Sequence, residues 1–286
     1  MMRSFTAGPR KGLSIAELII GMVILAIIGL ALTKVLRSQA MYFDHQKTSN
    51  LARSVARGPL NRVVSDIRMV EARGGVITAS ASVVELRVPY AMGVVCGPGP
   101  NNTTTHISLL PVDSAMFSAP GYSGYAWRGG NGVYRYREDN QTKDVGTLDV
   151  CNAKQIGTLT SQGARIVQIT PLLPDTASMG TAVFLYRKIR YSFAASTTLP
   201  GSIGLFRTRM ETNQSEELSA PYDASARFRF FVGSSFTAQD APPADLSTLR
   251  GIELNMTGLS ERAPSGASQP QRAPFVTAIF FKNRLD

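Results

Sequence analysis

The sequence predicts an α+β fold, in which a long N-terminal α-helix, first transmembrane and then amphipathic, packs on a C-terminal globular head of mainly antiparallel β-sheet. Three observations predict it. Residues 13–32 are almost entirely apolar, residues 33–72 continue with apolar side chains at helical spacing, and residues 73–286 change to short alternating segments separated by Gly, Pro, Asn and Ser. Residues 1–12 precede these as a short basic leader.

The composition is that of a folded protein. The chain has 286 residues, 44% hydrophobic and 17% charged, which allows one or two domains with a sizeable core and argues against a disordered chain. The net charge is +10; Arg3, Arg10 and Lys11 contribute three of these charges, so the remainder carries +7. This excess suits contact with lipid head groups or nucleic acid. The absence of a long run of Lys and Arg favours a role in solubility alone.

The segment Leu13–Leu32 is long enough to cross a bilayer. Twenty helical residues span about 30 Å, and no polar side chain occurs from Leu18 to Leu32. A secretory signal peptide has a shorter apolar region followed by a small-residue cleavage site, and a buried helix of a soluble protein is rarely apolar on every side. A simple membrane anchor fits the length but does not explain Glu17.

Glu17 is the unusual residue of this segment. An ionised acid in a membrane helix costs about 2.5–3.5 kcal/mol on insertion scales, and such residues usually have a partner and a function. If the chain is cut between Gly12 and Leu13, the new amino group lies one helical turn from Glu17. Glu17 of one subunit could then pair with the amine of a neighbour, which would favour side-by-side assembly.

The stretch Lys11–Leu18 (KGLSIAEL) resembles the prepilin signature of type IV pilins and type II secretion pseudopilins. The resemblance implies cleavage after Gly12 by the prepilin peptidase, N-methylation of Leu13, and a role for Glu17 in assembly. It also implies that the partners are other pilins or pseudopilins, the inner membrane and its assembly platform. The head would lie outside the cytoplasm, on a single-pass anchor that later joins a pilus or pseudopilus. Leu13 stands where Phe is commonest in this family, and Lys34 stands where many major pilins have a helix-kinking proline.

Apolar residues at helical spacing extend the helix through residues 33–72. Gly58-Pro59 interrupts the pattern and can bend the helix. A helix from Leu13 to about Glu71 would be roughly 87 Å long, with its second half carrying the head. The residues expected on the face toward the head are Leu51, Val55, Leu60, Val63, Val64, Ile67 and Val70.

The head is expected to consist of short strands. Gly121–Arg128 and Val133–Arg137 flank a four-residue turn, which predicts a hairpin. Exposed loops are expected at Asn101–Thr105, Asp240–Leu246 and Pro264–Pro274. The strand candidates are Val83–Val88, Val133–Arg137, Ala164–Thr170, Ala182–Phe193, Ser202–Arg209, Ala226–Val232, Leu249–Leu254 and Phe275–Phe281.

A second resemblance covers about 100 residues of the head, from Ala182 to Arg284. Their order and character are similar to the C-terminal half of the larger minor pilins, the W-type, and of the J-type pseudopilin of type II secretion. Residues 94–161 have no counterpart in it. The segments that carry it are AVFLYRKIRY (182–191), GLFRTRM (204–210), ELSAPYDASARFRFF (217–231), RGIEL (250–254) and FVTAIFFKNR (275–284).

The two cysteines, Cys96 and Cys151, both follow the apolar segment. If that part of the chain faces an oxidising compartment, we expect one disulfide, which would close a loop of about 55 residues and stabilise the head by roughly 3–4 kcal/mol. The alternative is a pair of unrelated buried thiols.

One aromatic and basic group is a candidate binding surface, in which bases could stack on the rings while arginines contact nucleic-acid phosphates. The alternative, which we favour, is a strand with a core face and a solvated face. Tyr134 and Tyr136 would then share one face. Arg135 and Arg137 would share the other. The candidate residues are Tyr125, Trp127, Arg128, Tyr134 and Arg135.

The sequence contains no recognisable catalytic motif, so an enzyme is not expected. CxxC, HExxH, P-loop and GxGxxG patterns are absent, and the two histidines, His45 and His106, are far apart. No cofactor is expected and no metal ligand can be named. The resemblance to the prepilin signature implies a minor pilin or pseudopilin, a structural subunit of a type IV pilus or type II secretion filament. The alternative is a single-span membrane-anchored adhesin or ligand-binding protein, with DNA as one ligand class.

Overall fold

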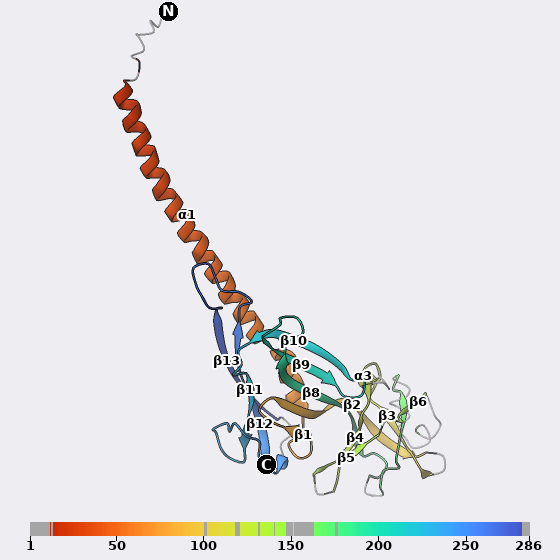
Figure 1. Cartoon of the computed structure of the whole chain (residues 1–286). Coiled ribbons are helices and arrows are strands. Elements are labelled where there is room, and N and C mark those ends of the chain that lie inside the picture. The colour runs from red at the N-terminus through yellow and green to blue at the C-terminus, as the bar shows by residue number, and fades with distance from the viewer. Residues whose placement is uncertain are drawn as a thin grey trace, which may run out of the picture.

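The computed structural model has the expected α+β architecture, in which one long N-terminal helix leads into a large antiparallel β-sheet domain (Figure 1). The helix extends far from the head, and the strands gather around and beyond its C-terminal end. Most of the predicted leader, Leu13 and the closing residues 282–286 lie outside the described residues. The structure describes residues 12, 14–99, 102–117, 121–130, 132–139, 141–146, 151, 163–174 and 177–281.

The elements follow the predicted order, with additions. The helices are α1 (Ile15–Arg57), α2 (Leu60–Met69), α3 (Pro111–Ser114) and the short 3-10 helix η3 (Leu246–Thr248). The strands are β1 (Val76–Ala79), β2 (Val83–Pro98), β3 (Thr105–Leu109), β4 (Gly124–Arg128), β5 (Tyr134–Glu138), β6 (Lys143–Gly146), β7 (Ile166–Ile169), β8 (Ala182–Ala195), β9 (Ile203–Arg209), β10 (Gln214–Tyr222), β11 (Arg227–Val232), β12 (Leu249–Leu259) and β13 (Arg272–Phe280).

Some of the predicted boundaries are wrong. Strands β1, β3, β6 and β10 have no counterpart among the strand candidates, and β2 continues well past its predicted end at Val88. The loop expected at Pro264–Pro274 is shorter, because Arg272 already pairs with Leu259 of β12. Thr105, expected in a loop, opens β3, where it pairs with Ile169.

The long helix is divided at the predicted break, and the head compensates for it. Pro59 has no backbone N–H, so the carbonyl of Val55 lacks the hydrogen bond that the fourth residue on would donate. The hydroxyls of Ser219 and Tyr222 donate to this oxygen instead, at 3.0 and 2.9 Å. The joint between α1 and α2 is therefore also a point of attachment to the sheet.

The face of α1 that touches the head is built from small residues. Its buried residues are Thr48, Ala52 and Ala56, whereas Leu51 is exposed, so the prediction for Leu51 is wrong. β12 approaches α1 so closely at Gly258 that a Cβ there would lie 2.3 Å from the Ala52 carbonyl oxygen. This close approach leaves room only for small side chains on the facing side of α1. The other predicted residues are buried or packed against the core: Val55, Leu60, Val63, Val64, Ile67 and Val70.

The sheet is antiparallel, with two long strands as its spine. Its main path is β11-β12-β10-β9-β8-β2-β3-β7-β6, with β1 on β2, β13 on β12, and the β4–β5 hairpin on β8. β2 and β8 pair from Val83↔Ser192 to Val94↔Ala182. The other edge of β8 pairs with β9 along one half and with β4 along the other half.

Two buried clusters lie along this spine. The cluster that includes α2 is called the proximal core here, and the cluster formed by β3, β4, β7 and the adjoining parts of β2 and β8 is called the distal core (Figure 1). The proximal core includes Val63, Ile67, Val84, Leu86, Ile189, Tyr191, Leu205, Tyr222, Phe228, Phe230, Ile252, Leu254 and Met256. The distal core includes Ala91, Val95, Ile107, Leu109, Phe117, Tyr122, Tyr125, Trp127, Val167, Ile169, Leu173, Val183 and Leu185.

Arg187 separates the two cores on β8. It lies between Leu185 of the distal core and Ile189 of the proximal core, two residues from each, so all three share one face of the strand. Its guanidinium lies 4.0 Å from the centre of the Tyr90 ring, and its Nε donates to the Gly121 carbonyl at 3.0 Å. Burial lowers the pKa of Arg187. A charged group therefore interrupts what would otherwise be one continuous apolar face.

Candidate functional site

The N-terminal part of α1 has no contact with the head that buries a side chain. No residue from Ile15 to Ala40 is buried. The side chains of Ile15 and Leu25 are 82% and 69% exposed, and the mean hydropathy of the most apolar window is 2.7. By length and composition, this helix could cross a membrane. So large an exposed apolar surface is unfavourable in water.

Glu17 lies in the first turn of α1, in a capping box with Ser14. The Glu17 backbone N–H donates to Ser14 Oγ at 3.2 Å, and the Ser14 backbone N–H donates to Glu17 Oε2 at 2.9 Å. Both groups would otherwise lack partners at the helix start. The capping box was not among the predictions, although the pattern Ser-x-x-Glu before an apolar run is its sequence signature.

The processing residues are only partly described. Gly12 is exposed and precedes the helix, which is compatible with access by a peptidase, whereas Leu13 lies outside the described residues. Glu17 is exposed on the bare part of the helix. Among the described residues no cation pairs with the Glu17 carboxylate. The carboxylate accepts a hydrogen bond from its own capping residue, Ser14.

An ion pair at Asp44 holds α1 to the head. The Arg262 guanidinium forms an ion pair with Asp44, and the Ser265 backbone N–H donates to Asp44 Oδ2 at 2.7 Å. These contacts lower the pKa of Asp44 to about 2, the Arg262 hydrogen bond having the largest effect. One residue further on, His45 Nδ1 lies 3.5 Å from Gln271 Nε2, so His45 is half-buried against the head and not on a fully solvated helix face.

A buried ion pair holds α2 to the sheet. Asp66 of α2 accepts from Arg207 Nε of β9 and from the Tyr191 hydroxyl of β8, at 2.9 and 2.7 Å. The Asp66 and Arg207 side chains are 13% and 6% exposed. Burial, followed by the charge of Asp66, raises the pKa of Tyr191. Because two strands converge on one carboxylate, the orientation of α2 on the sheet is well determined.

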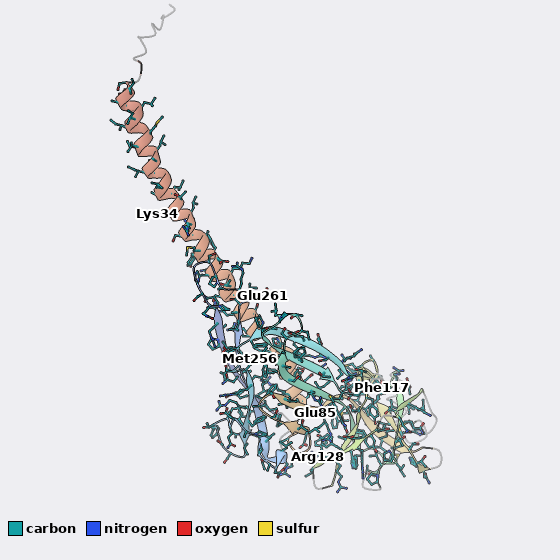
Figure 2. The ribbon with its side chains drawn as sticks, in the orientation of Figure 1. Lys34, Glu85, Phe117, Arg128, Met256 and Glu261 are labelled. Atoms are coloured by element: carbon teal, nitrogen blue, oxygen red, sulfur yellow. A yellow bond between two sulfur atoms is a disulfide. The ribbon has the colours of Figure 1, made fainter. Side chains whose placement is uncertain are left out.

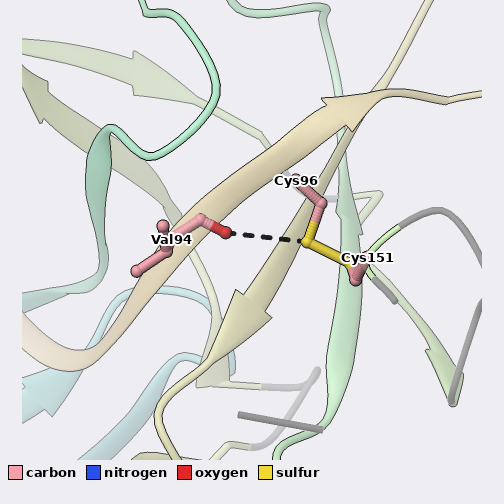
Figure 3. The surroundings of a disulfide bond; sticks show 3 residues. All are labelled: Val94, Cys96 and Cys151. Atoms are coloured by element: carbon pink, nitrogen blue, oxygen red, sulfur yellow. Dashed lines mark hydrogen bonds between the residues drawn. A yellow bond between two sulfur atoms is a disulfide. The ribbon is translucent and has the colours of Figure 1, made fainter. Parts of the chain in front are cut away.

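The predicted disulfide is present. Cys96 of β2 is bonded to Cys151, 55 residues further along, and both are fully buried (Figure 3). Ile166 of β7 and the half-buried Val145 of β6 pack around the bond. The disulfide therefore lies at the far end of the sheet, beside the distal core and away from α1 and α2.

The aromatic and basic surface proposed for nucleic acid is not formed. Tyr125 and Trp127 are 0% and 1% exposed and belong to the distal core, so their assignment to a binding surface is wrong. The alternation of β5 is confirmed: Tyr134 is half-buried and Arg135 is exposed. Arg128 is exposed at the end of the hairpin (Figure 2) and donates to the Gly132 carbonyl at 3.0 Å. β4 has β5 on one edge and β8 on the other. Tyr125 and Trp127 are buried because they lie on the face of β4 that packs into the distal core.

Other functional groups are few in the part of the chain that the structure describes. There, no group of three or more His, Cys, Asp or Glu could hold a metal ion. His106 is 2% exposed in β3, and burial lowers its pKa.

A comparison of the chain with family models, curated proteins and solved structures finds no match.

Proposed function

We propose that the chain is a minor pilin or pseudopilin, a structural and assembly subunit of a type IV pilus or a type II secretion filament. The observation that supports this most is the form of α1. The segment from Ile15 to Ala40, which is apolar as far as Leu32 apart from Glu17 in its first turn, buries no side chain, and an ion pair at Asp44 joins the helix to the head. A helix of this kind can be surrounded by lipid before assembly and by neighbouring helices afterwards.

The charge of Glu17 favours assembly over simple anchoring. A plain anchor gains nothing from an acid that costs about 2.5–3.5 kcal/mol in a membrane helix. After cleavage at Gly12, the amino group of Leu13 would be a cation one turn away in sequence. Pairing with the amine of a neighbouring subunit would neutralise two groups that are costly in lipid, and would set the stagger between subunits.

The proposed orientation places the head outside the cytoplasm, on the inner membrane before assembly. Arg3, Arg10 and Lys11 precede the apolar segment and would remain on the cytoplasmic side. A disulfide such as Cys96–Cys151 persists in an oxidising compartment, which supports a head on the opposite side. The partners would be the prepilin peptidase, other pilins or pseudopilins, and the assembly platform.

Mass spectrometry of the protein recovered from membranes tests the processing step. The proposal expects a chain that begins at methylated Leu13, and Gly12→Trp should leave the leader in place. A mature protein that begins at Met1 or Met2 would contradict the proposal and favour a single-span adhesin.

Two matched variants test the assembly step. Glu17→Gln keeps a side chain that can accept in the capping box but removes the charge, and Ser14→Ala removes the hydroxyl acceptor but keeps the charge. We expect Glu17→Gln to reduce incorporation into sheared filaments about tenfold or more, while Ser14→Ala has little effect and both remain in the membrane. The reverse order would show that Glu17 acts only as a cap.

A further inference from the structure

A small cavity opens between the end of α2 and the β4–β5 hairpin. Its volume is about 40 Å³, which is more than the 10–15 Å³ that one water molecule needs. Four aromatic rings form most of its wall, and a methionine, a proline and an alanine complete the apolar part. The lining residues are Met69, Glu71, Pro89, Ala126, Tyr134, Tyr136, Phe184 and Tyr186.

The one charged group in this wall is Glu71, which is 3% exposed. Neither of its carboxylate oxygens has a hydrogen bond of good geometry among the described residues, and the donors that face the carboxylate are the Arg73 backbone N–H and the Tyr136 hydroxyl. A buried carboxylate that lacks good hydrogen bonds is unfavourable, because protein replaces its hydration. A cation that enters the cavity would pair with the Glu71 carboxylate and offset the cost of burying it.

The aromatic rings are arranged for a cation with a round head. Tyr134 and Phe184 meet edge to face with 63° between their planes, and Tyr136 and Tyr186 do so with 68°. Each pair therefore presents ring surfaces in two directions instead of one flat slot. Ring faces attract cations through their quadrupole, and such cages recognise ammonium groups.

The nearest arginine does not fill this role. The Arg87 guanidinium lies 5.1 Å from the centre of the Tyr136 ring and 5.9 Å from that of the Tyr186 ring, but Arg87 is not part of the cavity wall. Its own charge is 3.6 Å from Glu138, and its Nη1 donates to the Gly74 carbonyl at 2.5 Å. Arg87 is therefore already paired, and Glu71 remains the acid that faces the cavity.

We propose that this cavity, the aromatic cage, is a binding site for an alkylammonium group, held by cation–π contact with the four rings and by the carboxylate of Glu71. The same chemistry is offered by a lysine side chain of a partner and by a free quaternary ammonium compound. The proposal is independent of the role in filament assembly, because it concerns only the head.

Titration of the full chain in detergent micelles, observed through the methyl resonance of Met69, tests the proposal. Met69 lines the cage, so a ligand beside the rings should shift its signal, which Met69→Leu would identify. Butylammonium represents a lysine side chain and tetramethylammonium represents a free quaternary ammonium. We expect at least one of them to saturate the shift, whereas tert-butanol and sodium chloride at matched concentration do not.

Two variants and a control locate the site. Glu71→Gln should weaken the ammonium affinity at least tenfold, and Tyr134→Leu, which keeps an apolar side chain but removes a ring, should weaken it in the same direction. Glu261→Gln removes an exposed carboxylate far from the cage (Figure 2) and should leave the affinity unchanged. Failure of both cations to bind, or equal binding by wild type and Glu71→Gln, would overturn the proposal. If Glu71→Gln does not fold, Tyr134→Leu decides between the outcomes.

Discussion

The proximal and distal cores of the head are stabilised by different kinds of contact. The proximal core is covered by α2 and by the end of α1, which are held by the Asp66–Arg207 ion pair and by close packing at Gly258. The distal core is not covered by a long helix and has the Cys96–Cys151 disulfide beside it. A core next to a helix can bury enough apolar area without a covalent link, whereas a small core at the end of a sheet benefits from one.

The same two strands nevertheless build both cores. β2 and β8 run through both, with Arg187 at the boundary. The cores therefore differ in the contacts that stabilise them. Substitutions at those contacts measure how far one core unfolds independently of the other. Trp127, the one tryptophan of the chain, lies in the distal core and reports on it by fluorescence.

The largest effect is expected from Asp66→Ala. It leaves the Arg207 guanidinium buried without its carboxylate, and breaking such a pair costs about 3–5 kcal/mol. Denaturant titration in detergent measures the loss, and amide hydrogen exchange should show it first in β9. Asp240→Ala is the control, because Asp240 is an exposed partner of Arg229 and should cost less than about 1 kcal/mol. Equal losses for the two variants would show that the Asp66 pair does not hold the proximal core.

Replacing both Cys96 and Cys151 by serine should cost about 3–4 kcal/mol, because the 55-residue loop is no longer closed in the unfolded chain. We expect the Trp127 fluorescence transition to move to lower denaturant than the transition followed by far-ultraviolet circular dichroism. Wild-type protein with reductant should reproduce the result. If both probes move together, β2 and β8 couple the two cores into one cooperative unit.

A smaller effect is expected from Gly258→Ala. The added Cβ would meet the Ala52 carbonyl oxygen of α1 at 2.3 Å, and overpacking against a backbone costs about 1–3 kcal/mol. Gly130→Ala is the matched control, because no atom lies within 4 Å of a Cβ there, and its effect should stay within about 0.5 kcal/mol. A neutral Gly258→Ala, measured by thermal unfolding, would mean that α1 can move away from β12 without loss.

The smallest effect, and the only stabilising one, is expected from Glu71→Gln, between the two cores. Burial raises the pKa of Glu71, so the folded state loses stability as pH rises above the ordinary glutamate value of about 4.3. Removal of the charge should therefore raise Tm at pH 7 by about 2–4 °C, or about 1 kcal/mol. The difference should vanish below pH 4, where the acid is protonated in both states. A destabilised variant at pH 7 would show that the Arg73 backbone and the Tyr136 hydroxyl already satisfy the carboxylate.

Local sequence patterns predicted the elements whose structure depends little on contacts with distant parts of the chain. The apolar run gives a helix whatever surrounds it, and Gly58-Pro59 breaks that helix for a covalent reason. β5 alternates as predicted, because one of its faces is solvated. β3 was missed because it is short and buried on both faces: its polar residues His106 and Ser108 are as buried as Ile107 and Leu109.

The sequence by itself determined the bare apolar helix with its single acid, the break at Pro59 and the α+β class, because these depend on backbone chemistry and on periodicity within one segment. Only the tertiary structure decided that Tyr125 and Trp127 are core residues, that small residues rather than Leu51 face the sheet, and that Glu71 lies among four aromatic rings. These depend on which strands flank β4, how closely β12 approaches α1, and where the hairpin meets the end of α2. These are contacts between segments that are distant in the chain, so no pattern within one segment predicts them.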